Sequence, residues 1–77
     1  MSESPIIKRS VVIAGHATSV SLEPEFWDVL KQIAVTEGLS VAALIRQVDG
    51  NLVPSDHRNL SSALRVYILK QLLSSAR

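Results

Sequence analysis

The sequence predicts an α+β fold in which N-terminal strands precede three helices, assembled as a homodimer. Polar and apolar residues alternate near the start of the chain, and three later segments show the helical spacing of apolar residues. The chain has 77 residues, of which 47% are hydrophobic and only 19% are charged. A domain of this size covers only part of its apolar surface by itself, so its composition favours association of two chains. The composition therefore predicts that residues 1–77 form one domain that pairs with a second copy.

The composition also narrows the functional classes. The chain has no cysteine, which excludes disulfide bonds and thiolate metal sites. Its net charge of +1 favours neither nucleic acid nor a membrane surface as a partner. No apolar run approaches the roughly 20 residues that cross a bilayer. The first nine residues place an acid before the first apolar pair, unlike a signal peptide. We expect a cytoplasmic protein with no membrane partner.

The first 22 residues predict extended structure. Residues 1–5 are polar or small, and we expect them to be disordered. Residues 6–22 form a strand region, because isoleucine and valine dominate its first half and apolar residues alternate at its end. Gly15 interrupts this region and accepts a positive φ. Two arrangements are open: a hairpin that turns at Gly15, or one long strand with a bulge there.

A first helix is predicted over residues 24–37. Pro24 suits its first turn, because proline has a helical φ and the missing N–H is not needed there. The apolar stripe of this helix consists of Phe26, Leu30, Ile33 and Ala34, with Trp27 and Val29 beside it. Gly38 follows, and glycine often closes a helix because it accepts the left-handed conformation.

Two further helices are predicted over residues 40–49 and 59–74. Ser40 is a good N-cap for the first of them, since its side-chain oxygen can accept from an early backbone N–H. The last helix is apolar around most of its circumference. Such a helix must be covered on more than one side. We expect a second subunit, or another protein partner, against it.

The middle of the chain combines a strand with inward-facing Val20 and Leu22, a Glu-Pro helix start, and the sequence Gly38-Leu39-Ser40 between two amphipathic helices. Over residues 17–48 this order resembles the ribbon-helix-helix family. The resemblance implies that two chains pair their strands into an antiparallel ribbon between subunits, which enters the major groove of DNA. It also implies that the start of the second helix faces a phosphate.

Carried over to this sequence, the resemblance assigns roles to individual residues. The outward ribbon face would consist of Ala17, Ser19 and Ser21, and Ser40 would mark the phosphate contact. Lys8 and Arg9 would add positive charge if the first strand lies beside the ribbon. The dimer core would consist of Val20, Leu22, Phe26, Trp27, Leu30, Leu44 and Ile45.

The predicted function is DNA binding, by a small dimeric transcriptional regulator or an antitoxin-like repressor. The alternative is a dimeric protein-interaction module that has this fold without reading DNA. Residues 17–39 favour the alternative, because they contain four acids against one lysine and carry a local charge of −3. The last helix also favours the protein-interaction module, because its apolar surface could bind a protein partner.

Neither catalysis nor metal binding is predicted. The serines lie in strand, cap and tail contexts, with no nucleophile–base pair and no glycine-rich phosphate loop. The two histidines, His16 and His57, lack the spacing of metal ligands. We expect a protein that is not an enzyme and holds no cofactor.

Overall fold

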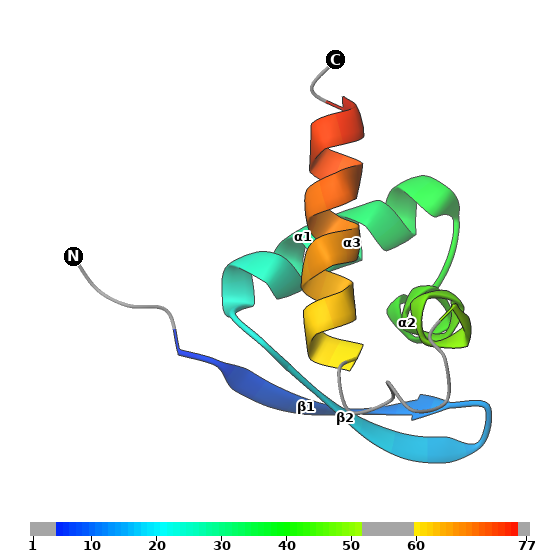
Figure 1. Cartoon of the computed structure of the whole chain (residues 1–77). Helices are drawn as coiled ribbons and strands as arrows, with labels where there is room; N and C mark the ends of the chain where they lie inside the picture. Colours follow the sequence, from blue (N-terminus) through cyan, green and yellow to red (C-terminus); the bar gives the residue numbers. More distant parts are fainter. Residues whose placement is uncertain (1–4, 52–59, 76–77) are drawn as a thin grey trace.

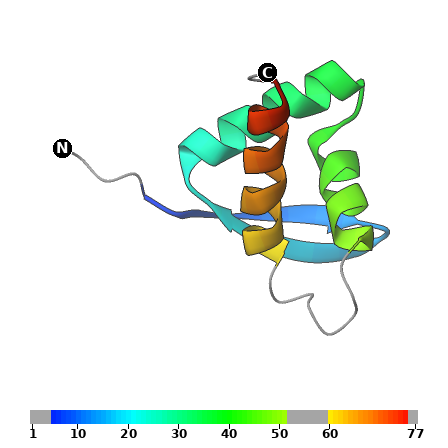
Figure 2. The same cartoon turned by 45° about the horizontal axis from the view of Figure 1, so that its top comes forward.

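The computed structural model of the protein describes residues 5–51 and 60–75. A two-stranded antiparallel sheet is followed by three helices, which all lie on one face of the sheet (Figures 1 and 2). The elements are β1 (Ile7–Ile13), β2 (His16–Leu22), α1 (Pro24–Glu37), α2 (Val41–Gly50) and α3 (Leu60–Ser75). The α+β class predicted from the sequence, with strands before three helices, is confirmed.

The two strands form a hairpin within one chain. They pair in a register that runs from Ile7 opposite Leu22 to Ile13 opposite His16. The two residues between the strands, Ala14 and Gly15, both have positive φ, at 51° and 83°. This is the turn geometry that matches the right-handed twist of paired strands. The hairpin, and not the single bulged strand, is therefore the correct arrangement. Pairing between subunits stays a prediction.

The helix ends follow from their capping residues. Gly38 closes α1 in the left-handed conformation, at φ 72°, and the N–H of Leu39 donates to the carbonyl of Ala34 at 2.8 Å. Ser40 then caps α2, because its Oγ accepts from the backbone N–H of Ala43 at 3.0 Å.

The helix bounds lie within one residue of those predicted. α1 spans the predicted range, and α2 ends one residue later than predicted. α3 also ends one residue later, and its predicted first residue, Asn59, lies outside the described residues. The segment predicted to be disordered, residues 1–5, also lies outside the described residues except for Pro5.

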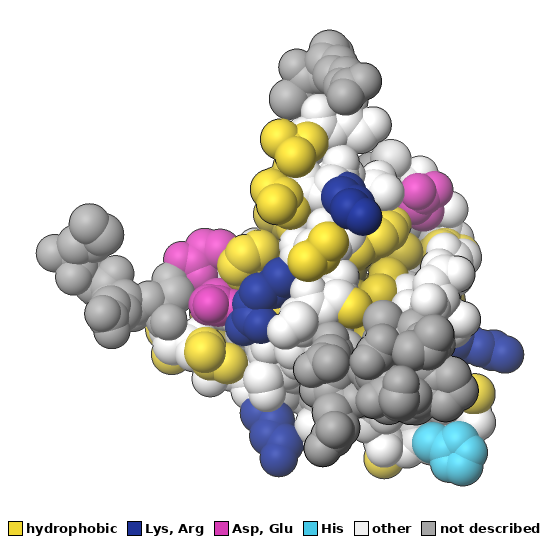
Figure 3. All heavy atoms as spheres, viewed as in Figure 1, with side chains coloured by type: hydrophobic (Ala, Val, Ile, Leu, Met, Phe, Trp, Pro, Cys, Tyr) yellow, Lys and Arg dark blue, Asp and Glu magenta, His cyan; other side chains and the backbone are white. Residues whose placement is uncertain are grey.

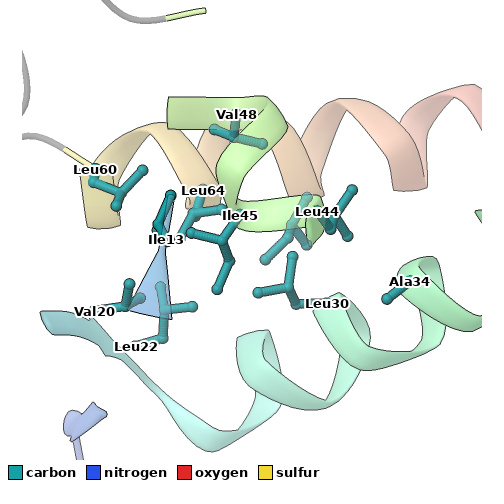
Figure 4. Close-up of a cluster of buried hydrophobic side chains, with 11 residues drawn as sticks. Ile13, Val20, Leu22, Leu30, Ala34, Leu44, Ile45, Val48, Leu60 and Leu64 are labelled. Carbon is teal, nitrogen blue, oxygen red and sulfur yellow. The ribbon is translucent and has the colours of Figure 1, made fainter. Parts of the chain in front are cut away.

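One hydrophobic core lies between the sheet and the helices (Figure 4). The predicted core residues that are fully buried here are Val20, Leu22, Leu30, Leu44 and Ile45, while Phe26 and Trp27 are partly buried and pack against them. α3 completes the core with Leu60, Leu64 and Ile68. These side chains are therefore buried inside a single chain, and their role in a dimer stays a prediction.

α3 keeps an apolar surface on its outer side. Its exposed hydrophobic residues are Val66, Leu69, Leu72 and Leu73, each close to half exposed or more. Hydrophobic side chains accordingly run along this helix in the space-filling view (Figure 3). A single chain thus leaves the second side of α3 uncovered. No helix in the described part of the chain is long and apolar enough to span a membrane.

Leu30→Ala should lower the free energy of unfolding by about 2–5 kcal/mol, because it leaves a cavity at the centre of the core. Leu30 has no solvent exposure, whereas Val35 on the same helix is 80% exposed. Val35→Ala is therefore the matched control and should change stability by no more than about 0.5 kcal/mol. Urea denaturation of both variants measures the difference, and equal stabilities would contradict the described packing.

Ser40→Ala should lower the free energy of unfolding by about 1 kcal/mol, because the N–H of Ala43 loses its acceptor. Ser40→Asp keeps an acceptor at the cap and should retain most of the stability. Thermal melts of the two variants compare these effects. If Ser40→Ala melted at the same temperature as the unaltered protein, the assignment of Ser40 as the N-cap would be contradicted.

Candidate nucleic-acid interface

The face of the hairpin that points away from the helices is the candidate site, and we call it the outer face. Three cross-strand pairs form it: Lys8 with Ser21, Ser10 with Ser19, and Val12 with Ala17. Five of these six residues are exposed, and Ser21 is half-buried. The intervening residues turn toward the helices, because successive side chains of a strand point to opposite faces. The outer face is therefore accessible and two strands wide.

The structure brings together most of the residues that the sequence nominated for DNA contact. Lys8, Ala17, Ser19 and Ser21 all lie on the outer face. Sequence reasoning missed two members of this face, Ser10 and Val12. The signal that identifies them is the cross-strand register, which the sequence left open between a hairpin and a single strand.

Arg9 does not join Lys8 on the outer face, contrary to the prediction that both cations would flank the ribbon. It pairs across the sheet with buried Val20, and its guanidinium lies over the ring of Trp27, 4.4 Å from the centroid. Its Nη1 is buried and has no hydrogen-bond partner among the described residues. The period of two along β1 separates the two adjacent cations onto opposite faces.

Side chains of α3 form hydrogen bonds and an ion pair with the end of β2 and the start of α1. The Nε and Nη2 of Arg65 donate to one carboxylate oxygen of Glu23, at 3.1 and 2.8 Å, and Nη2 also donates to the carbonyl of Ser21 at 3.4 Å. The backbone N–H of Ser21 donates to the Oγ of Ser61 at 3.0 Å. Both backbone groups of Ser21 therefore bond to α3, and this contact fixes the hairpin against the helices.

The same contact changes the acidity of Glu23. Hydrogen bonding from Arg65 is the main cause that holds the pKa of this carboxyl below its usual value of 4.5. A hydrogen bond to its own backbone lowers the pKa as well, burial raises it by less than these hydrogen bonds lower it, and the charge of Arg65 adds the smallest lowering. The carboxylate therefore stays ionised as the partner of Arg65.

The acids of the middle segment lie away from the outer face. Neither β1 nor β2 contains an acidic residue. Glu23 is paired with Arg65, and the others belong to α1, on the opposite side of the sheet (Figure 1). Among these, Asp28 pairs with Lys31 at 3.5 Å. The local charge of −3 is thus not a charge of the outer face.

Ser40 lies far from the outer face. α2 begins at the end remote from the hairpin and runs toward it (Figure 2). Its last turn is the part that meets the hairpin, since Asp49 lines a common pocket with Ile13, Ala14 and His16. A helix of ten residues is about 15 Å long. The structure therefore does not bring Ser40 together with the outer-face residues in one chain.

The chemistry of the outer face suits contact with a polar surface. Three hydroxyls can donate and accept, one ammonium can donate, and two apolar side chains lie at the turn end. Among the described residues, no group of three or more histidines or acids could hold a metal ion. His16 is exposed in β2, next to the turn, and His57 lies outside the described residues.

The comparisons with known proteins agree with this architecture. The profile of a family described as the ribbon-helix-helix domain matches residues 6–72, from β1 into α3. Among solved structures, the chain is similar to an uncharacterized protein from Bordetella pertussis Tohama I, with 39% identity and a TM-score of 0.79. The similarity covers 95% of this chain and 60% of that protein, so the chain spans about three fifths of its relative. No curated protein matches.

Glu23→Gln should destabilise the protein in a pH-dependent way. Because the folded-state pKa of Glu23 lies below 4.5, its ion pair stabilises the fold above that pH. This contribution is lost as the pH falls through the lowered value. The difference in unfolding free energy between the unaltered protein and the variant should therefore shrink as the pH falls from near neutral to below 4.5.

Urea titrations across this range measure that difference. The control is the same substitution in an Arg65→Ala background, where the ion pair is already absent and the pH dependence of the difference should be weaker. An equal pH dependence in both backgrounds would contradict the assigned pair.

Proposed function

Because the chain belongs to the ribbon-helix-helix domain family, we propose that it is a DNA-binding protein, acting in the cytoplasm as a small transcriptional regulator or an antitoxin-like repressor. Proteins of this family typically bind DNA as dimers. The observation that carries the proposal is the outer face of the hairpin, which is exposed, free of acidic residues and two strands wide.

The width of the hairpin supports insertion into the major groove. This groove is about 12 Å wide and admits a two-stranded β-ribbon. All three helices lie on the other side of the sheet and would remain outside the groove (Figure 2). The hydroxyls of Ser10, Ser19 and Ser21 would then meet base edges, to which serine can both donate and accept.

The charge of the outer face sets the strength of binding. Lys8 is its single cation, since Arg9 faces Trp27. Each phosphate that a cation neutralises contributes about −0.9 to the slope of log affinity against log salt concentration. One chain should therefore show a slope on the order of −1 through Lys8, and a homodimer about twice that. This is a weakly charged interface, so its affinity must also come from hydroxyl and apolar contacts.

A second candidate function is a protein-interaction module of the same fold. The observation that favours it is the apolar outer side of α3, where Val66, Leu69 and Leu73 recur at helical spacing and are about half exposed. A surface of this kind commonly marks association with protein. A second copy of the chain or another protein would cover it.

Titration of fluorescent genomic DNA fragments at two salt concentrations tests the proposal. We expect binding that weakens with salt and that is reduced in Lys8→Ala. The matched control is Lys70→Ala, which removes the same charge from α3, on the other side of the sheet, and should bind like the unaltered protein. Absence of binding even at low salt would favour the protein-interaction module.

A further inference from the structure

We propose that the hairpin prefers thymine-containing sites, and that Val12 is the residue that confers this preference by contact with the 5-methyl group of the base. This inference rests on the proposed function, because it requires the outer face to lie in the major groove. It concerns specificity, which the serines of the outer face leave undetermined, since serine can bond to either kind of base edge.

Val12 is an exposed apolar side chain on an otherwise small or polar face. It is 66% exposed, more than any other large hydrophobic residue of the two strands. Its neighbour Val11 points the other way and packs against the core. The side chain of Val12 thus belongs to the outer face and is available to a ligand.

The side chains of the outer face change from apolar to polar and then to charged with distance from the turn. Val12 and Ala17 form the apolar pair next to the turn, Ser10 and Ser19 form the middle pair, and Lys8 lies with Ser21 at the far end. Val12 and Lys8 are four residues apart, which is about 13 Å along a strand. At a rise of about 3.4 Å per base pair, this distance covers about four steps of DNA. Lysine and valine can therefore meet different base pairs at the same time.

The major groove offers one apolar group, the methyl of thymine, and apolar side chains are its usual partners. A valine in the groove beside any other base would lose water without gaining an apolar contact. Covering one methyl group should strengthen binding by about fourfold. The pair of Val12 and Ala17 is therefore the part of the outer face that can recognise the methyl group of thymine.

The experiment compares synthetic duplexes that differ only in pyrimidine methyl groups. One pair contains alternating dA with either dT or dU, and a second pair contains alternating dG with either dC or 5-methyl-dC. The variants are Val12→Ser and, as a matched control on an exposed helical valine, Val35→Ser. Circular dichroism verifies that both variants are folded.

We expect the unaltered protein and Val35→Ser to bind the dT duplex at least about fourfold more tightly than the dU duplex. Val12→Ser should bind both duplexes alike, with the salt dependence through Lys8 retained. Equal binding of the dT and dU duplexes by the unaltered protein would overturn the inference but leave DNA binding intact. A gain on 5-methyl-dC alone would overturn the assignment to thymine. Absence of binding to every duplex would overturn the proposed function itself.

Discussion

The register of the hairpin is the constraint on which the rest of the structure depends. Because side chains alternate along a strand, a slip of one residue would exchange the two faces. Val12 would then enter the core in place of Val11, and Arg9 would face outward. The two-residue turn at Ala14 and Gly15 fixes the register at one end. The core and the outer face are therefore specified by the same few backbone pairs.

α3 holds the hairpin at its other end. Ser61 and Arg65 are four residues apart, so they lie on the same side of the helix and reach the two backbone groups of Ser21 together. Leu64 lies between them in sequence and is fully buried in the core. α3 thus uses neighbouring residues for two tasks: Ser61 and Arg65 bind the backbone of β2, and Leu64 packs in the core. Arg65 also binds Glu23, so that one side chain joins β2, α1 and α3.

The sequence predicts the helices well because their signals are local. Pro24, Gly38 and Ser40 each act through their own backbone geometry or their own side chain, so the helix bounds follow from single residues. The site is harder to predict, because it depends on pairing between distant residues. Pairing with Ser19 and Ala17 of β2 places Ser10 and Val12 on the outer face. Pairing with Val20, which is buried in the core, places Arg9 on the opposite face. The adjacency of Lys8 and Arg9 in a strand implies that they lie on opposite faces, but not which of the two faces outward.

The bonds at Ser21 also bear on how a second chain can approach. A strand that added to the free edge of β2 over its whole length would need the N–H and carbonyl of Ser21, which Ser61 and Arg65 already occupy. Pairing there would cost the displacement of both side chains. The edge of β2 therefore stays closed to a further strand at this end while α3 stays in place. In this chain β1 supplies the strand beside β2, so a two-stranded ribbon forms within a single chain.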